Sequence, residues 1–131
     1  MAAAESYPDG LKYHREHDWA WIEGDEATLG VTWFAQDALG ELVHYEPPAP
    51  GDSVAVDASY GEVESVKAVS DLIAPLSGEV LEVNQAVIDA PETVNEDPYG
   101  AGWLIRVRLS DPGEVDALLE AAGYREFLAT Q

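Results

Sequence analysis

The chain has 131 residues, no cysteine and a formal net charge of −20, from 26 acidic residues against 6 lysines and arginines. This length suits one domain with a sizeable core, and the absence of cysteine excludes disulfides, thiolate metal sites and a cysteine nucleophile. The charge argues against nucleic acid and anionic membrane surfaces as partners, because like charges repel, and it suits encounters with basic proteins. Composition alone slightly favours the plainer interpretation that the charge maintains solubility. No segment approaches the length of a membrane span, so we expect a soluble chain.

Strands are predicted where apolar and polar residues alternate between turn signals. We expect residues 1–12 to form a loose tail that precedes them. In chain order the predictions are a hairpin over residues 17–31 with its turn at 23–26, and strands over 41–45, 52–65, 67–74, 79–83 and 103–110. Prolines after residue 45 stop the first single strand, because proline cannot donate to a ladder. Residues 89–103, with two prolines and two glycines, are predicted to be a loop.

Two segments carry helix signals. Thr32 is a suitable N-cap and Gly40 a suitable C′ residue for a helix of about two turns between them. Near the C-terminus, an N-cap, a first-turn proline and a capping-box acid follow one another as Asp111, Pro112 and Glu114. We expect Gly123 to break this C-terminal helix in two.

Together these elements predict a single mainly-β domain over residues 1–131. We expect a small β-sandwich or flattened barrel, with its β core at residues 13–110, a short early helix and a helical segment at residues 111–131. Long crossover helices are missing from the pattern, which argues against a parallel sheet.

One of the two lysines occupies an unusual place in this pattern. Lys67 lies where the chain reverses between two predicted strands, with Glu62 and Glu64 before it and Asp71 after it. A side chain at such a tip lies far from the core and can be reached from most directions. A lysine with no role, simply solvated, is the default interpretation of an isolated hairpin lysine.

The surrounding residues change this interpretation. The run Glu64-Ser65-Val66-Lys67-Ala68 resembles the lipoyl-attachment motif of the H proteins of the glycine cleavage system. The resemblance continues from about residue 14 to residue 109 in several separate motifs. These are residues 17–19 (His-Asp-Trp), 30–32, 35–36, 39–40, 70–75, 77–80, 94–95, 97–100 and 102–103. Biotin carriers share the fold but flank their lysine with methionine, which this motif lacks.

The resemblance implies a carrier with no catalytic residues of its own. Lipoic acid would be joined by an amide to Lys67, and the arm would carry the aminomethyl group of glycine from the glycine decarboxylase subunit to the aminomethyltransferase. Lipoamide dehydrogenase and a lipoate-attaching enzyme are the other partners implied. We expect a monomer without a metal, located in the cytoplasm of a bacterium or in the mitochondrial matrix of a eukaryote.

The resemblance also implies a groove in which the loaded arm rests, with Asp18, Phe34 and Asp71 as its candidate residues. Here the chain departs from the family, because Trp33 and Phe34 replace polar residues and Asp18 replaces a glutamate. We expect a more apolar groove, in which Asp18 carries a large share of adduct protection.

Two alternatives remain open. One is another lipoyl-bearing carrier, which serves a 2-oxo acid dehydrogenase or a lipoate relay. The other is an interaction module that keeps the fold and is not modified.

Overall fold

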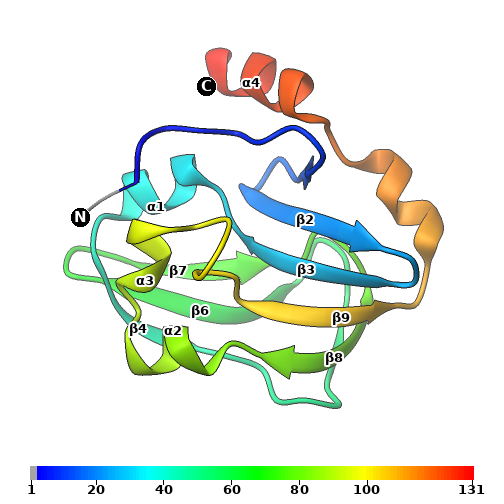
Figure 1. Ribbon diagram of the computed structural model, residues 1–131, viewed down its shortest axis with the longest axis horizontal. Coiled ribbons are helices and arrows are strands. Elements are labelled where there is room, and N and C mark those ends of the chain that lie inside the picture. The colour runs from blue at the N-terminus through cyan, green and yellow to red at the C-terminus, as the bar shows by residue number, and fades with distance from the viewer. Residues whose placement is uncertain (1–2) are drawn as a thin grey trace.

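The computed structural model describes residues 3–131, which fold into two antiparallel sheets with short helices at their edges (Figure 1). The six-stranded sheet has the order β1 (Lys12–Tyr13), β2 (Asp18–Glu23), β3 (Glu26–Val31), β9 (Ile105–Leu109), β8 (Gly78–Val83) and β5 (Ser53–Val54). The three-stranded sheet has the order β4 (Leu42–Glu46), β6 (Ser59–Ser65) and β7 (Val69–Ile73). The helical elements are α1 (Trp33–Leu39), α2 (Gln85–Asp89), α3 (Thr93–Glu96), the 3₁₀ helix η1 (Pro112–Ala117) and α4 (Ala121–Ala129). The predicted β-sandwich is confirmed.

The main core lies between the two sheets. Alternate residues of each strand are buried, so Tyr45, Val63 and Leu72 of the three-stranded sheet meet Leu29 and Val107 of the six-stranded sheet in one apolar cluster. Successive side chains of a strand point to opposite faces of the sheet, so every second residue lies on the same face. The opposite face of β4, β6 and β7 therefore lies open to solvent.

The first hairpin forms as predicted, with Glu23 opposite Glu26 and a two-residue turn between them. Its pairing also places Trp19 opposite Gly30. A Cβ added at Gly30 would lie 2.6 Å from the Trp19 indole, so glycine leaves the room that this buried ring requires. The indole Nε1 donates to the carbonyl oxygen of Pro98 at 3.0 Å, which fixes the ring against the late loop.

The helix signals around α1 are confirmed. The Thr32 hydroxyl accepts a hydrogen bond from the amide of Ala35, and Gly40 ends the helix with φ at 87°, a left-handed value that favours glycine. Its amide donates to the carbonyl oxygen of Gln36.

Two predictions about later segments are wrong. The predicted loop at residues 89–103 contains α3 and the end of α2. Helix α2 is too short to show a helical period in the sequence, and its N-cap, Asn84, is predicted only as the end of a strand. The C-terminal segment begins as a 3₁₀ helix that ends at Leu118, and Leu119 then pairs with Tyr13 of β1 rather than continuing the helix. Gly123 lies inside α4 and does not break it.

The prediction of a loose N-terminal tail is also wrong for residues 3–11. They lack regular structure up to β1, but Tyr7 is buried in a second, aromatic cluster with Tyr13, Trp19 and Tyr124. The Tyr7 ring meets the Tyr124 ring edge-on at 5.5 Å, and Arg125 donates to the carbonyl oxygen of Tyr7. Aromatic contacts with α4 therefore order this segment.

Candidate lipoyl-attachment site

The candidate site is the turn between β6 and β7, which Ser65 organises. Strand pairing ends at Glu64 opposite Val69, and the Ser65 amide then donates to the carbonyl oxygen of Ala68 at 2.7 Å. The buried Ser65 hydroxyl accepts from the amides of Lys67 at 3.3 Å and Ala68 at 3.1 Å. Motif resemblance assigned Ser65 no role, but these contacts show that it closes the turn that presents Lys67.

Lys67 itself is exposed at the tip, as predicted. Across residues 3–131 its amine makes no ion pair, although carboxylates flank it in sequence. Its side chain extends over the end of α1, where a Cβ added at Gly40 would lie 3.5 Å from the Lys67 Cε. The methylene chain therefore passes over a glycine, and the amine at its end is free to react.

The second lysine has different surroundings. Lys12 lies in β1, its side chain is 32% exposed, and its Nζ lies 3.2 Å from the Glu120 carboxylate that precedes α4. An amide at this nitrogen would remove its charge and the ion pair. The geometry thus favours Lys67 as the acylated lysine.

The remaining motif residues fall on either side of this turn. Glu64 is exposed at the end of β6, and Val66 and Ala68 are exposed beside Lys67. Among residues 3–131, Val66 is the most exposed large apolar side chain, at 74%. Backbone contacts, rather than packing of these side chains, shape the tip.

The structure places the three predicted groove residues in different surroundings. Asp71 is exposed on β7 opposite Glu62, whereas the half-buried Phe34 ring on α1 packs against the His17 ring at 4.6 Å. Asp18 is only 2% exposed and accepts a hydrogen bond from the Tyr60 hydroxyl at 2.9 Å. The groove formed by these three residues remains a prediction.

Burial gives Asp18 unusual acid–base properties. Loss of hydration raises the pKa of its carboxyl well above the usual range, and the nearby Glu16 acts in the same direction. The Tyr60 hydrogen bond opposes this rise, because it stabilises the ionised carboxylate. Burial also raises the pKa of Tyr60 well above its usual value, so this hydroxyl keeps its proton and remains a donor.

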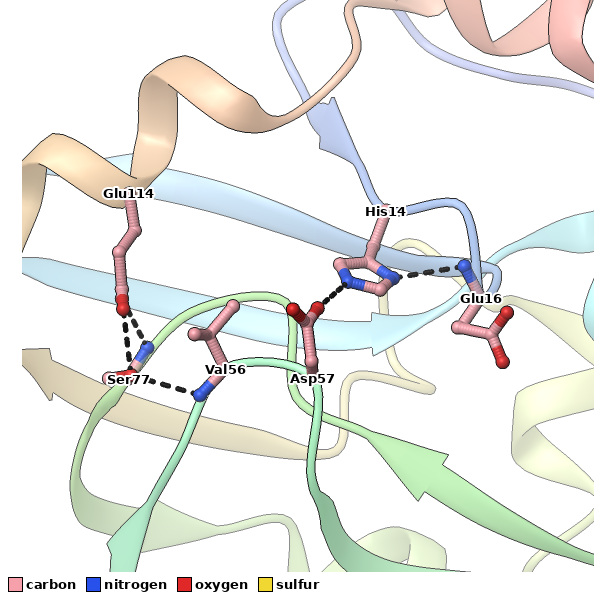
Figure 2. A network of polar contacts seen from close by, with 6 residues as sticks. All are labelled: His14, Glu16, Val56, Asp57, Ser77 and Glu114. Atoms are coloured by element: carbon pink, nitrogen blue, oxygen red, sulfur yellow. Dashed lines mark hydrogen bonds and ion pairs between the residues drawn. The ribbon is translucent and has the colours of Figure 1, made fainter.

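The opposite end of the β6–β7 hairpin is tied to its surroundings by polar side chains (Figure 2). Glu114 of η1 accepts from the Ser77 amide at 2.8 Å and from its hydroxyl at 2.9 Å, and the Ser77 hydroxyl accepts from the Val56 amide. Glu114 therefore joins η1 to the turn before β8, and the predicted capping box is wrong.

His14 forms the second part of this network. Its Nδ1 accepts from the Glu16 amide at 2.9 Å, which leaves Nε2 to carry the proton toward the Asp57 carboxylate at 2.6 Å (Figure 2). Asp57 lies in the turn before β6.

Among residues 3–131, no three His, Cys, Asp or Glu side chains are grouped to hold a metal, and no helix is long and apolar enough to cross a membrane.

Comparisons with known proteins agree with this geometry. The family model described as glycine cleavage H-protein matches residues 11–131. The chain is 51% identical over 124 residues to the glycine cleavage system H protein of an Anaeromyxobacter species, covering 95% of this chain and 97% of that protein. It is 51% identical over 119 residues to the protein of the same name from a Cyanothece species, covering 91% of this chain and 92% of that one.

A solved structure shows the same fold. The crystal structure of a glycine cleavage system H protein from Mycobacterium marinum matches with a TM-score of 0.86 and 44% identity, covering 93% of this chain and 98% of that one. The fold, the presented lysine and these matches agree, and the chain belongs to the glycine cleavage H-protein family.

Proposed function

We propose that this chain is the lipoyl-bearing shuttle of a glycine cleavage system, with lipoic acid in amide linkage to Lys67. The observation that carries the proposal is the free, exposed amine of Lys67 at a turn closed by Ser65, within a chain of this family. A primary amine on a long flexible stem provides both the amide and the reach.

The residues at the tip fit this cofactor. The Lys67 amine has no competing ion pair within residues 3–131, and the tip backbone is held by hydrogen bonds that do not use the lysine side chain. When bound, lipoic acid supplies a dithiolane that can take up a carbon group and electrons. The chain's own residues hold the arm at the surface, and docking raises the effective concentration of the arm at an enzyme's active site.

The partners follow from the same proposal. The decarboxylase subunit would load the carrier, the aminomethyltransferase would unload it, lipoamide dehydrogenase would reoxidise it, and a lipoate-attaching enzyme would modify Lys67. The chain acts as a carrier without catalytic residues of its own. Its relatives named above are bacterial, which supports a location in the bacterial cytoplasm.

The test combines a measurement of protein mass with a measurement of activity. Protein from its native host should carry one lipoyl group, and the lipoylated protein should support release of labelled carbon dioxide from glycine by the decarboxylase subunit. A lipoyl group without release of carbon dioxide would favour another lipoyl carrier. An unmodified chain would favour an interaction module.

A further inference from the structure

The outer face of the three-stranded sheet carries an arrangement of charge that opposes folding. Glu46 on β4 pairs directly with Glu62 on β6, and Glu62 pairs with Asp71 on β7. All three are exposed, on the face opposite the core residues Tyr45, Val63 and Leu72. We call these three acids the carboxylate row.

Directly opposed side chains in a sheet have Cβ atoms about 5 Å apart, and like charges at that distance destabilise the pairing. Glu62 has such a neighbour on both sides. His44 approaches only the outermost member, with its Nε2 3.0 Å from Glu46, and the side chains of both are largely exposed. The row therefore keeps a repulsion that a cationic surface would relieve.

The same face becomes apolar toward Lys67. Val43 in the β4 bulge is 48% exposed, Val69 opposite Glu64 is 62% exposed, and Val66 lies at the tip. These three valines, the valine tip, surround the end of the hairpin. At about 3.3 Å per residue, the carboxylate row lies roughly 10 Å along the strands from the turn.

We propose that the outer face of β4, β6 and β7, from the carboxylate row to the valine tip, is the docking surface for an enzyme with matching chemistry. That enzyme surface has an apolar rim around the cavity that receives the arm, and a cluster of lysines and arginines roughly 10 Å from that rim. The inference rests on the proposed function and adds which face of the carrier the enzyme contacts.

Charge complementarity carries this choice of partner. Lys67 is the only cation among the residues of the three strands and their tip, and acylation removes it, so the modified carrier presents four carboxylates on this face: the row and Glu64. Attraction between such a face and a basic patch speeds encounter and fixes orientation. Contact by the valine tip then removes apolar surface from water and slows dissociation.

The experiment compares two triple variants of equal charge. The row variant is Glu46→Gln, Glu62→Gln and Asp71→Asn, and the control is Asp9→Asn, Asp116→Asn and Glu126→Gln, all exposed and outside the three strands. Each changes the formal net charge from −20 to −17, because three carboxylates are lost. Binding of lipoylated carrier to the glycine decarboxylase subunit is measured at low and high salt, with thermal unfolding of each carrier alone.

We expect the row variant to bind about tenfold more weakly at low salt, with most of the loss in the association rate, and the control to change by less than twofold. The difference should shrink at high salt, where exposed charges are screened within about 3 Å at 1 M. The row variant alone should unfold at a higher temperature than the control, since the repulsion is gone. Val69→Thr should speed dissociation, whereas Ile88→Thr on α2 should not.

Equal affinities for the two triple variants would overturn the proposal and leave the carrier function intact. An unfolding temperature for the row variant below that of the control would contradict the repulsion on which it depends. Failure of the wild-type carrier to be loaded by the decarboxylase subunit would instead count against the proposed function.

Discussion

The two ends of the β6–β7 hairpin are built in opposite ways. At the tip, the Ser65 hydroxyl accepts from two turn amides, and the side chain of the exposed Lys67 passes over Gly40 at the end of α1. At the base, Asp57 contacts His14, and Glu114 holds the turn that follows β7 (Figure 2). The candidate lysine thus lies where few side-chain contacts hold the chain, whereas the polar side chains that tie the hairpin to other elements lie at its opposite end.

The largest expected effect tests the free end. Lys67→Arg should abolish lipoylation and shuttling completely, because guanidinium cannot form the amide. The free energy of unfolding should change by less than about 0.5 kcal/mol, as for other exposed sites. Lys12→Arg is the matched control and should retain full lipoylation. The check is intact mass after expression with lipoate, and lipoate on Lys12 would refute the assignment.

Removing a contact at the base of the hairpin should lower stability and leave lipoylation unchanged. Glu114→Ala removes the carboxylate that accepts two hydrogen bonds from Ser77, and we expect a loss of about 1–2 kcal/mol in the free energy of unfolding. Asp116→Ala, on the exposed side of the same 3₁₀ helix, should cost less than about 0.5 kcal/mol. Both variants should be lipoylated normally. Urea unfolding measures the first effect, and equal stabilities would show that the base network contributes little.

The buried acid near the base has a pH-dependent effect of predictable sign. Its raised pKa in the folded state means that protonated Asp18 stabilises the fold at low pH, and that this contribution is lost as pH rises through the folded-state pKa. Asp18→Asn should therefore be more stable than wild type above that pKa, because the amide has no charge to remove from water. The advantage should disappear below pH 3.8, the unshifted value. Urea unfolding across pH measures it, and a constant difference would contradict it.

The same variant tests the predicted groove. If Asp18 protects the loaded arm, Asp18→Asn should speed spontaneous loss of the aminomethyl group from the free carrier and leave lipoylation of Lys67 unchanged. The decay is followed by mass spectrometry. Equal decay in wild type and variant would leave Asp18 with a structural role in the core alone.

A smaller effect is expected at the turn. Ser65→Ala removes the acceptor for the amides of two exposed residues, so the cost should be about 1 kcal/mol. Lipoylation should nevertheless slow severalfold, because the turn that presents Lys67 loses the bonds that close it. Ser59→Ala, at the base end of the same strand, should not slow it. Unchanged lipoylation of the Ser65 variant would mean that the enzyme reads Lys67 without the turn.

Local signals account for what the sequence could predict. The hairpin of residues 17–31, the Thr32 cap and the exposed Lys67 each follow from neighbours in the chain. Contacts between distant segments could not be predicted in this way. The partner of Asp18 is Tyr60, 42 residues away, and Tyr7 is ordered by Tyr124 near the other end of the chain. Burial of Asp18 and order in the N-terminal segment therefore required the structure.

Lys67, the exposed lysine at the tip, is the residue that we propose carries the arm. The most direct measurement is peptide mass mapping of the chain purified from its native host, followed by loading with glycine and the decarboxylase subunit. The account predicts one lipoyl group, on the peptide that contains Lys67, and a further mass increment there after loading. Lipoate on the Lys12 peptide, or an unmodified Lys67 in a host that lipoylates its other carriers, would contradict it.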